Sequence, residues 1–152
     1  MTIASAVCNS FKTEVLEAKH NFLASGGNTF NIALYTSSAT LNKSTTAYAT
    51  NPGGGSNTEI SNTSGSAYSP KGKALTSVNP ALSTDTACCD FNDISWTSAS
   101  FTANGCLIFN DTASGDPAVC AIAFGSDKTV TSGTFTIQFP TADASNAILR
   151  IA

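Results

Sequence analysis

The second half of the chain constrains the fold most, because it is a succession of short β-strand patterns separated by turn signals. Phe135, Ile137 and Phe139 alternate with polar residues, which is typical of a strand with one face in water. Asn104-Gly105 and Ser132-Gly133 are among the dipeptides that indicate turns. Regular short strands favour a sandwich or a barrel, and we expect a mainly β fold, an antiparallel β-sandwich. The expected strands are 73–78, 86–91, 94–96, 100–103, 105–110, 118–124, 134–139 and 147–151.

A helical period occurs near the N-terminus, over residues 3–23. Val7, Phe11, Val15, Ala18 and Phe22 follow one another at intervals of four, four, three and four, so on a helix they form one apolar stripe. The glycines at 26 and 27 would end this helix. We therefore expect one N-terminal α-helix whose stripe docks on the sheet or on a neighbouring subunit.

A long polar stretch follows the first expected strand, which covers residues 28–35. Residues 42–72 are rich in Gly, Ser and Asn and contain few apolar side chains. They predict an arm-like loop inside a single domain that spans 1–152; a loop of this length is usually functional or disordered. Its composition favours a partner surface as the element that holds it in place, with packing on its own chain as the alternative.

The composition excludes several partners. Charged residues make up only 11% of the chain, the formal net charge is −3 and no basic run occurs. Binding to nucleic acid or to an anionic membrane draws on clustered Lys and Arg, so we expect neither. A surface with so few charges suits a protein that is packed against neighbours.

The cysteines and the N-terminus predict assembly in a cytoplasm. The N-terminal residues lack the positive start and the unbroken apolar stretch of a secretory signal. An odd number of cysteines without a CxxC pair favours free, buried thiols over a disulfide framework. The five are Cys8, Cys88, Cys89, Cys106 and Cys120.

Residues for catalysis, metal binding or cofactor binding are scarce. His20 is the single histidine, so no second one is available for a zinc site, and no GxSxG motif of a serine hydrolase occurs. Asp90 and Asp93 are the carboxylates whose spacing would let them face one another across a bend, which is weak evidence for acid–base chemistry. We therefore expect no enzyme, no metal and no cofactor.

Aromatic residues offer a binding alternative. Tyr35, Tyr48, Tyr68 and Trp96 would present flat apolar faces to sugar rings if they were exposed. Ile94 shares a face with Trp96 in the expected strand, which favours a core or subunit-contact role for the tryptophan instead. A glycan-binding adhesin is thus the alternative from another functional class.

Several segments resemble a group of small virion structural proteins of tailed bacteriophages, including phages of cyanobacteria. The resemblance covers both ends of the chain and is weakest over 42–72. It rests on residues 7–22, 30–41, 93–96, 100–110, 123–128 and 135–151. Members of this group are head decoration, tail or generic virion proteins, so the resemblance implies a component of the virion and no catalytic residues.

Together these observations predict a capsid decoration (cement) protein. The expected partners are the major capsid protein and further copies of the chain, in a small homo-oligomer such as a trimer, in a particle assembled in the host cytoplasm. A neck, tail or fibre component is the nearest alternative. The candidate interface residues are Val7, Phe11, Val15, Phe22, Tyr48, Tyr68 and Trp96.

Overall fold

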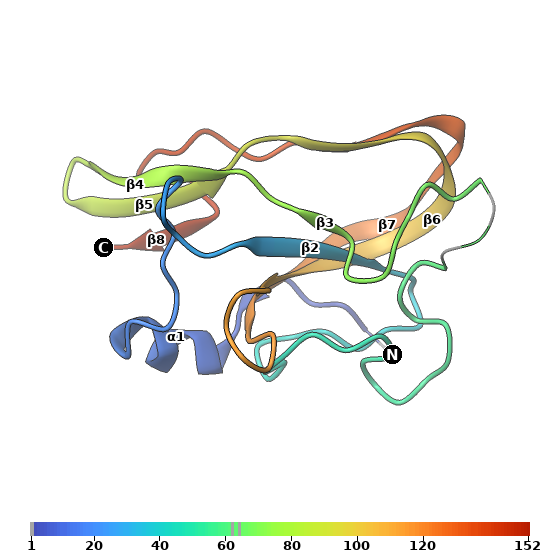
Figure 1. Ribbon diagram of the computed structural model, residues 1–152, viewed down its shortest axis with the longest axis horizontal. Coiled ribbons are helices and arrows are strands. Elements are labelled where there is room, and N and C mark those ends of the chain that lie inside the picture. Colours follow the sequence, from blue (N-terminus) through green and yellow to red (C-terminus); the bar gives the residue numbers. More distant parts are fainter. Residues whose placement is uncertain (1, 62, 64) are drawn as a thin grey trace.

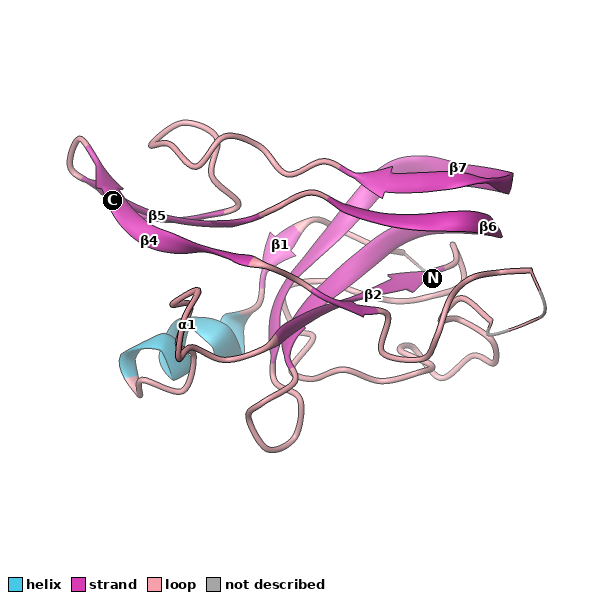
Figure 2. Ribbon diagram, turned by 45° about the horizontal axis from the view of Figure 1, so that its top comes forward, coloured by secondary structure: helices cyan, strands magenta, loops and turns pink. Residues whose placement is uncertain are grey.

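The computed structural model describes residues 2–61, 63 and 65–152, and within them the chain is mainly β with one short helix. In chain order the elements are β1 (Ala6–Val7), α1 (Asn9–Leu16), β2 (Phe30–Tyr35), β3 (Lys73–Ala74), β4 (Ser77–Ser83), β5 (Thr86–Phe91), β6 (Ile94–Asn110), β7 (Ala118–Ile137) and β8 (Leu149–Ile151). The strands form a five-stranded antiparallel sheet in the order β1-β7-β6-β2-β3 and a three-stranded one in the order β4-β5-β8 (Figure 1 and Figure 2). The predicted β-sandwich with an N-terminal helix is confirmed.

A long antiparallel ribbon of β6 and β7 joins the layers of the molecule. Its register pairs Ile94 with Ile137 at one end and Phe109 with Ala118 at the other. In Figure 1 the ribbon runs along the top, bends at the right and returns beneath. The register shifts between Ala103 and Gly105, and such bulges bend a strand. The strands expected at 94–96, 100–103 and 105–110 are therefore one strand, and those expected at 118–124 and 134–139 belong to another.

Both turns predicted above lie inside strands, Asn104-Gly105 in β6 and Ser132-Gly133 in β7. A Cβ on Gly105 would lie 2.6 Å from the carbonyl oxygen of Ile122 and 2.8 Å from the side chain of Ile3, so this glycine permits a close approach within β6. Asn79-Pro80 lies in β4, an edge strand with a register shift between residues 78 and 81. Proline is tolerated there because an edge position does not need its N–H for the ladder.

The N-terminal helix is shorter than predicted. It spans Asn9–Leu16 instead of 3–23, and Val7 lies in β1, paired with Cys120 of β7. Ala18 has a φ of 57°, a left-handed backbone conformation that does not continue a helix. Phe22 reaches the core from the irregular segment that follows, where its ring stacks on Phe30 at a centroid distance of 4.2 Å. Four of the five stripe residues, Val7, Phe11, Val15 and Phe22, thus pack inward from three different backbone conformations, whereas Ala18 is exposed.

The segment 42–72 is a long loop that packs back onto β2. Its described residues contain isolated bridges and no longer strand pairing. The Tyr35 hydroxyl donates to the carbonyl oxygen of Ala49 at 2.8 Å, and the hydroxyls of Tyr48 and Tyr68 donate to the Glu59 carboxylate at 2.8 Å each. The loop is attached to the sheet by the Tyr35 hydrogen bond, by the N–H of Leu34, which donates to the Tyr68 hydroxyl at 2.9 Å, and by the Tyr48 ring, which stacks on Phe109. The expectation that a partner surface holds this loop is therefore wrong.

Candidate interaction surface

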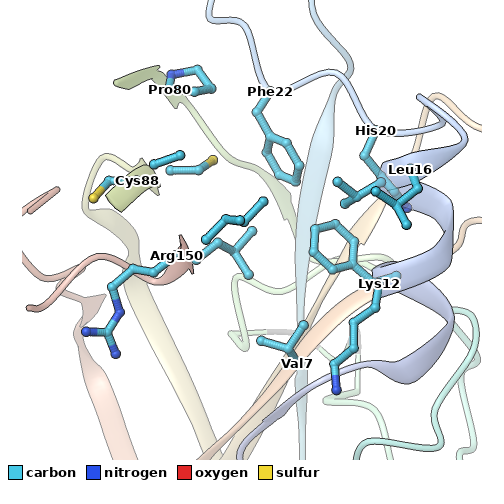
Figure 3. A pocket seen from close by; sticks show the side chains of 14 residues that line it. Val7, Lys12, Leu16, His20, Phe22, Pro80, Cys88 and Arg150 are labelled. Atoms are coloured by element: carbon cyan, nitrogen blue, oxygen red, sulfur yellow. The ribbon is translucent and has the colours of Figure 1, made fainter. Parts of the chain in front are cut away.

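A groove lies between α1 and the three-stranded sheet. Its volume is about 460 Å³, and its lining is formed mostly by apolar side chains of α1, β5 and β8 together with Phe22. In Figure 1 the helix lies below the sheet, at the end of the molecule that carries the C-terminus. Figure 3 shows Phe22, His20 and Leu16 on one side of the groove and Cys88 and Arg150 on the other.

The register of the small sheet shows which side chains look into this groove. Leu82 of β4 is opposite Ala87 of β5, and Ala87 is opposite Ile151 of β8. Directly opposed residues of antiparallel strands project from the same face. Ala87 and Ile151 line the groove, so this face is the one turned towards the helix, and Leu82 belongs to it.

The helix covers only part of that face. Leu16, the last residue of α1, is 88% exposed, Leu82 is 74% exposed and Ile151 is 64% exposed. Leu16, Ile151 and the exposed Ala87 line the groove, and the register places Leu82 next to Ala87 on the same face of the sheet. We call these four side chains the end surface. Apolar patches on a folded domain mark contact sites for other molecules, whereas single exposed leucines do not.

Four exposed charges surround the end surface. Lys12 and Arg150 line the groove, Glu17 follows Leu16 directly, and Asp85 lies in the turn between β4 and β5. Among the described residues none of these four side chains takes part in an ion pair. The surface is thus apolar at its centre and carries unpaired charges of both signs at its rim, as protein–protein interfaces do.

His20 lies at the inner wall of the groove and is held there by both ring nitrogens. Nε2 lies 2.9 Å from Glu14 Oε2, and Nδ1 lies 3.2 Å from Nδ2 of Asn110. The Asn110 side-chain oxygen accepts hydrogen bonds from the backbone N–H groups of Thr112 and Ala113, which fixes the amide orientation. Nδ1 is therefore an acceptor and Nε2 the donor to Glu14. With both nitrogens bonded and the ring between Phe11 and Phe30, this histidine has a packing role.

The cysteines are free and buried, as predicted. Burial raises the pKa of the Cys8 thiol to about 11 and that of Cys89 to about 12, and it raises the pKa values of Cys106 and Cys120 as well. Reactive thiols have lowered pKa values, so these four behave as small apolar side chains.

The two aspartates proposed as a pair have separate structural roles. Asp90 is 1% exposed and accepts hydrogen bonds from the backbone N–H groups of Phe91 and Ile148. Burial raises its pKa above the usual value. Asp93 accepts from the N–H of Phe139. Both carboxylates therefore cap backbone groups at the joints of the sheet.

The structure divides the seven predicted interface residues into two groups. Val7, Phe11, Val15 and Phe22 converge on the groove. Tyr68 and Trp96 are each 1% exposed and belong to the core, so the prediction that they lie at an interface is wrong. Tyr48 is half-buried against Phe109 and bonded to Glu59.

The predicted binding of sugar rings by exposed aromatic side chains is contradicted by the burial of three of them. Tyr35, Tyr68 and Trp96 are all inside the molecule, because the loop 42–72 covers the first two and the β6–β7 ribbon encloses the third. Sequence reasoning missed Leu16, Leu82 and Ile151, which lie outside the helical stripe or close to a turn and the chain end.

The described ranges 2–61, 63 and 65–152 contain a further groove. A second groove, of about 530 Å³, lies between β7 and the segment 138–148 and is lined by Phe124, Phe135 and Phe139, which are partly buried. No group of three or more His, Cys, Asp or Glu side chains in these ranges is arranged to hold a metal ion. Within the same ranges the helix is too short and too polar to pass through a lipid bilayer. Comparison with models of known protein families, with curated protein sequences and with solved structures gives no match to this chain.

Proposed function

We propose that this protein is a structural subunit of a tailed-bacteriophage particle, and specifically a capsid decoration protein that acts through protein–protein interfaces. The observation that carries the proposal is the end surface, where Leu16, Leu82 and Ile151 are 88%, 74% and 64% exposed in a single chain. Fully burying a leucine or isoleucine side chain contributes about 1.5–3 kcal/mol, so covering this surface favours association. The resemblance of both ends of the sequence to small virion proteins supports the same function.

The proposed mechanism is mechanical. Copies of the protein bind the outer face of the shell, contact adjacent major capsid subunits and oppose their separation under the pressure of the packaged DNA. Each contact is modest, and many copies on one lattice act multivalently. The rigid sandwich with its tied-down loop suits this role, because a clamp that is already ordered loses little conformational entropy when it binds.

The exposed tip of the loop is the proposed contact with the capsid. Gly54 lies in this tip with a φ of 80° and with open space around it, while the base of the loop is fixed by the hydrogen bonds to Glu59. Replacing the tip residues 53–56 by a shorter Gly-Gly turn would shorten the contact without disturbing Glu59. This variant should bind shells more weakly than the parent.

Counting and rebinding test the function. In purified particles that encode the chain, quantitative mass spectrometry should find it in numbers comparable with the major capsid protein. Purified protein added to shells that lack it should bind and raise their resistance to heat. A copy number far below that of the capsid protein, with no binding to shells, would refute decoration and point to the neck, tail or fibre.

A further inference from the structure

We infer that the end surface binds a second copy of this chain, in a two-fold dimer formed by the same surface of both subunits. The inference rests on the homo-oligomeric part of the proposed function and does not depend on the capsid. The sequence left the number of copies open, with a trimer as one form. The distribution of shape and charge at the end surface favours two.

The shape is self-complementary. The surface carries a projecting apolar side chain, Leu16, 88% exposed, beside a groove of about 460 Å³. In a two-fold arrangement the surface of one subunit faces the identical surface of the other. Each Leu16 would then lie against the groove of the partner, over the face of the small sheet that α1 leaves open, where Leu82, Ala87 and Ile151 are exposed.

The charges are self-complementary too. The rim holds two cations, Lys12 and Arg150, and two acids, Glu17 and Asp85, which take part in no ion pair among the described residues. The direct hydrogen bonds of the cations are to neutral groups: Lys12 Nζ lies 3.4 Å from Asn9 Oδ1, and Arg150 donates to the carbonyl oxygens of Ala144 and Ser145. The carboxylate of Asp143 lies near Arg150 and adds a further negative charge there. A rim on which both signs are represented meets its own copy without the repulsion that a rim of one sign would cause.

A strongly charged partner fits this rim less well than a second copy does. An acidic peptide would pair with Lys12 and Arg150 but would be repelled by Glu17 and Asp85. A basic peptide would pair with the two acids and be repelled by the two cations. The charge pattern therefore selects the second copy over a partner of either net charge.

The first test is the mass of the purified full chain in solution. Sedimentation equilibrium should give twice the 15.5 kDa of one chain, with dissociation on dilution. Leu16→Glu and Ile151→Glu should each raise the dimer dissociation constant about tenfold or more. Thr131→Glu adds the same charge at an exposed position of β7 away from the groove, and it should leave the constant unchanged. Trp96 fluorescence should confirm that all variants are folded.

The second test reverses rim charges, and it does not require knowing which residues pair across the dimer interface. In one double variant, Lys12→Glu with Arg150→Glu, all four rim charges are negative; in another, Glu17→Lys with Asp85→Lys, all four are positive. Each should be monomeric alone, and an equimolar mixture should form heterodimers that high salt weakens. Failure of the mixture to associate would overturn the charge argument.

The outcomes separate this inference from the proposed function. A parent protein that stays monomeric at high concentration, or an oligomer that Leu16→Glu does not weaken, overturns the dimer, even if the protein still coats shells. If the monomer coats shells and Leu16→Glu abolishes that binding, the end surface belongs to the capsid and the inference is wrong. A dimer that fails to bind shells supports the inference and refutes decoration.

Discussion

Removing the hydroxyl of Tyr68 tests how the loop 42–72 is held on the sheet. This hydroxyl accepts a hydrogen bond from the backbone N–H of Leu34 at 2.9 Å and donates one to Glu59 Oε1 at 2.8 Å. The side chain is 1% exposed, so no water can replace the lost group. Tyr68→Phe therefore leaves the N–H of Leu34 unpaired inside the protein and removes one donor from a carboxylate.

The expected cost follows from these two losses. A hydrogen bond to a charged group contributes about 1.5–3 kcal/mol, and an unpaired buried donor costs about 1–3 kcal/mol. The two are not fully additive, because Glu59 Oε1 keeps its 2.8 Å hydrogen bond from the backbone N–H of Lys71. We expect Tyr68→Phe to lower the free energy of unfolding by about 2–4 kcal/mol.

Tyr48→Phe is the matched control, since it removes a hydroxyl from the other oxygen of the same carboxylate. Tyr48 is only half-buried, so water can replace the lost donor and the cost should be about 0.5–1.5 kcal/mol. Urea unfolding followed by Trp96 fluorescence measures the free energy of unfolding of both variants. The fluorescence reports on this region because the ring centroids of Trp96 and Tyr68 lie 6.3 Å apart. Equal costs for the two variants would refute the role assigned to Tyr68.

Other buried groups give three further expectations. Burial raises the pKa of Tyr35 well above its ordinary 10.0, so the folded state holds this proton more tightly and unfolding becomes easier as the pH rises above 10.0; tyrosine absorbance and unfolding should change together. Cys8 and Cys89 have pKa values of about 11 and 12 and so are protonated at mildly alkaline pH. They should not react with a thiol reagent there until urea unfolds the protein. Burial raises the pKa of Asp90 above 3.8, so ionising this carboxyl destabilises the fold as the pH rises through that range. The free energy of unfolding of Asp90→Asn, relative to that of the parent, should therefore be higher at neutral pH than in acid. An equal difference at both pH values would contradict this.

The sequence predicted strands well where the turn chemistry and the hydrophobic period agree. β5 has the predicted bounds, Thr86–Phe91. The error at Asn104-Gly105 arose because a glycine serves a turn and a close approach equally well, and only the position of Ile122 across the ribbon shows which applies. Long-range pairing of this kind is invisible to a local pattern.

The helix shows how a correct burial prediction can rest on a wrong backbone. Spacings of three and four predicted that Val7, Phe11, Val15 and Phe22 share a surface, and they do line one groove. The same spacings could not show that Val7 would pair with Cys120 as a strand. Tertiary hydrogen bonding there overrides the local helical preference, whose contribution is small for each residue.

The end surface was missed because two sheet pairings create it. Leu82 and Ile151 are far apart in the sequence and share a face only because each is linked to Ala87 through the register. Nothing near either residue marks it as exposed. The loop 42–72 was misjudged for a related reason, since its few tyrosines and the buried Glu59 fix it more strongly than its Gly and Ser content indicated.

Apolar residues that serve folding and those that serve docking respond differently to truncation. Phe11 is 7% exposed and packs against His20 and Phe22, so Phe11→Ala should lower the free energy of unfolding by about 3 kcal/mol. Leu82 is 74% exposed, and Leu82→Ser should change it by less than about 0.5 kcal/mol in dilute protein. If the end surface is a contact site, the second substitution should nevertheless weaken association, measured by sedimentation. A Leu82→Ser variant that unfolds more easily while associating as before would mean that this leucine belongs to the core, and that the sheet face beneath it is closed in solution.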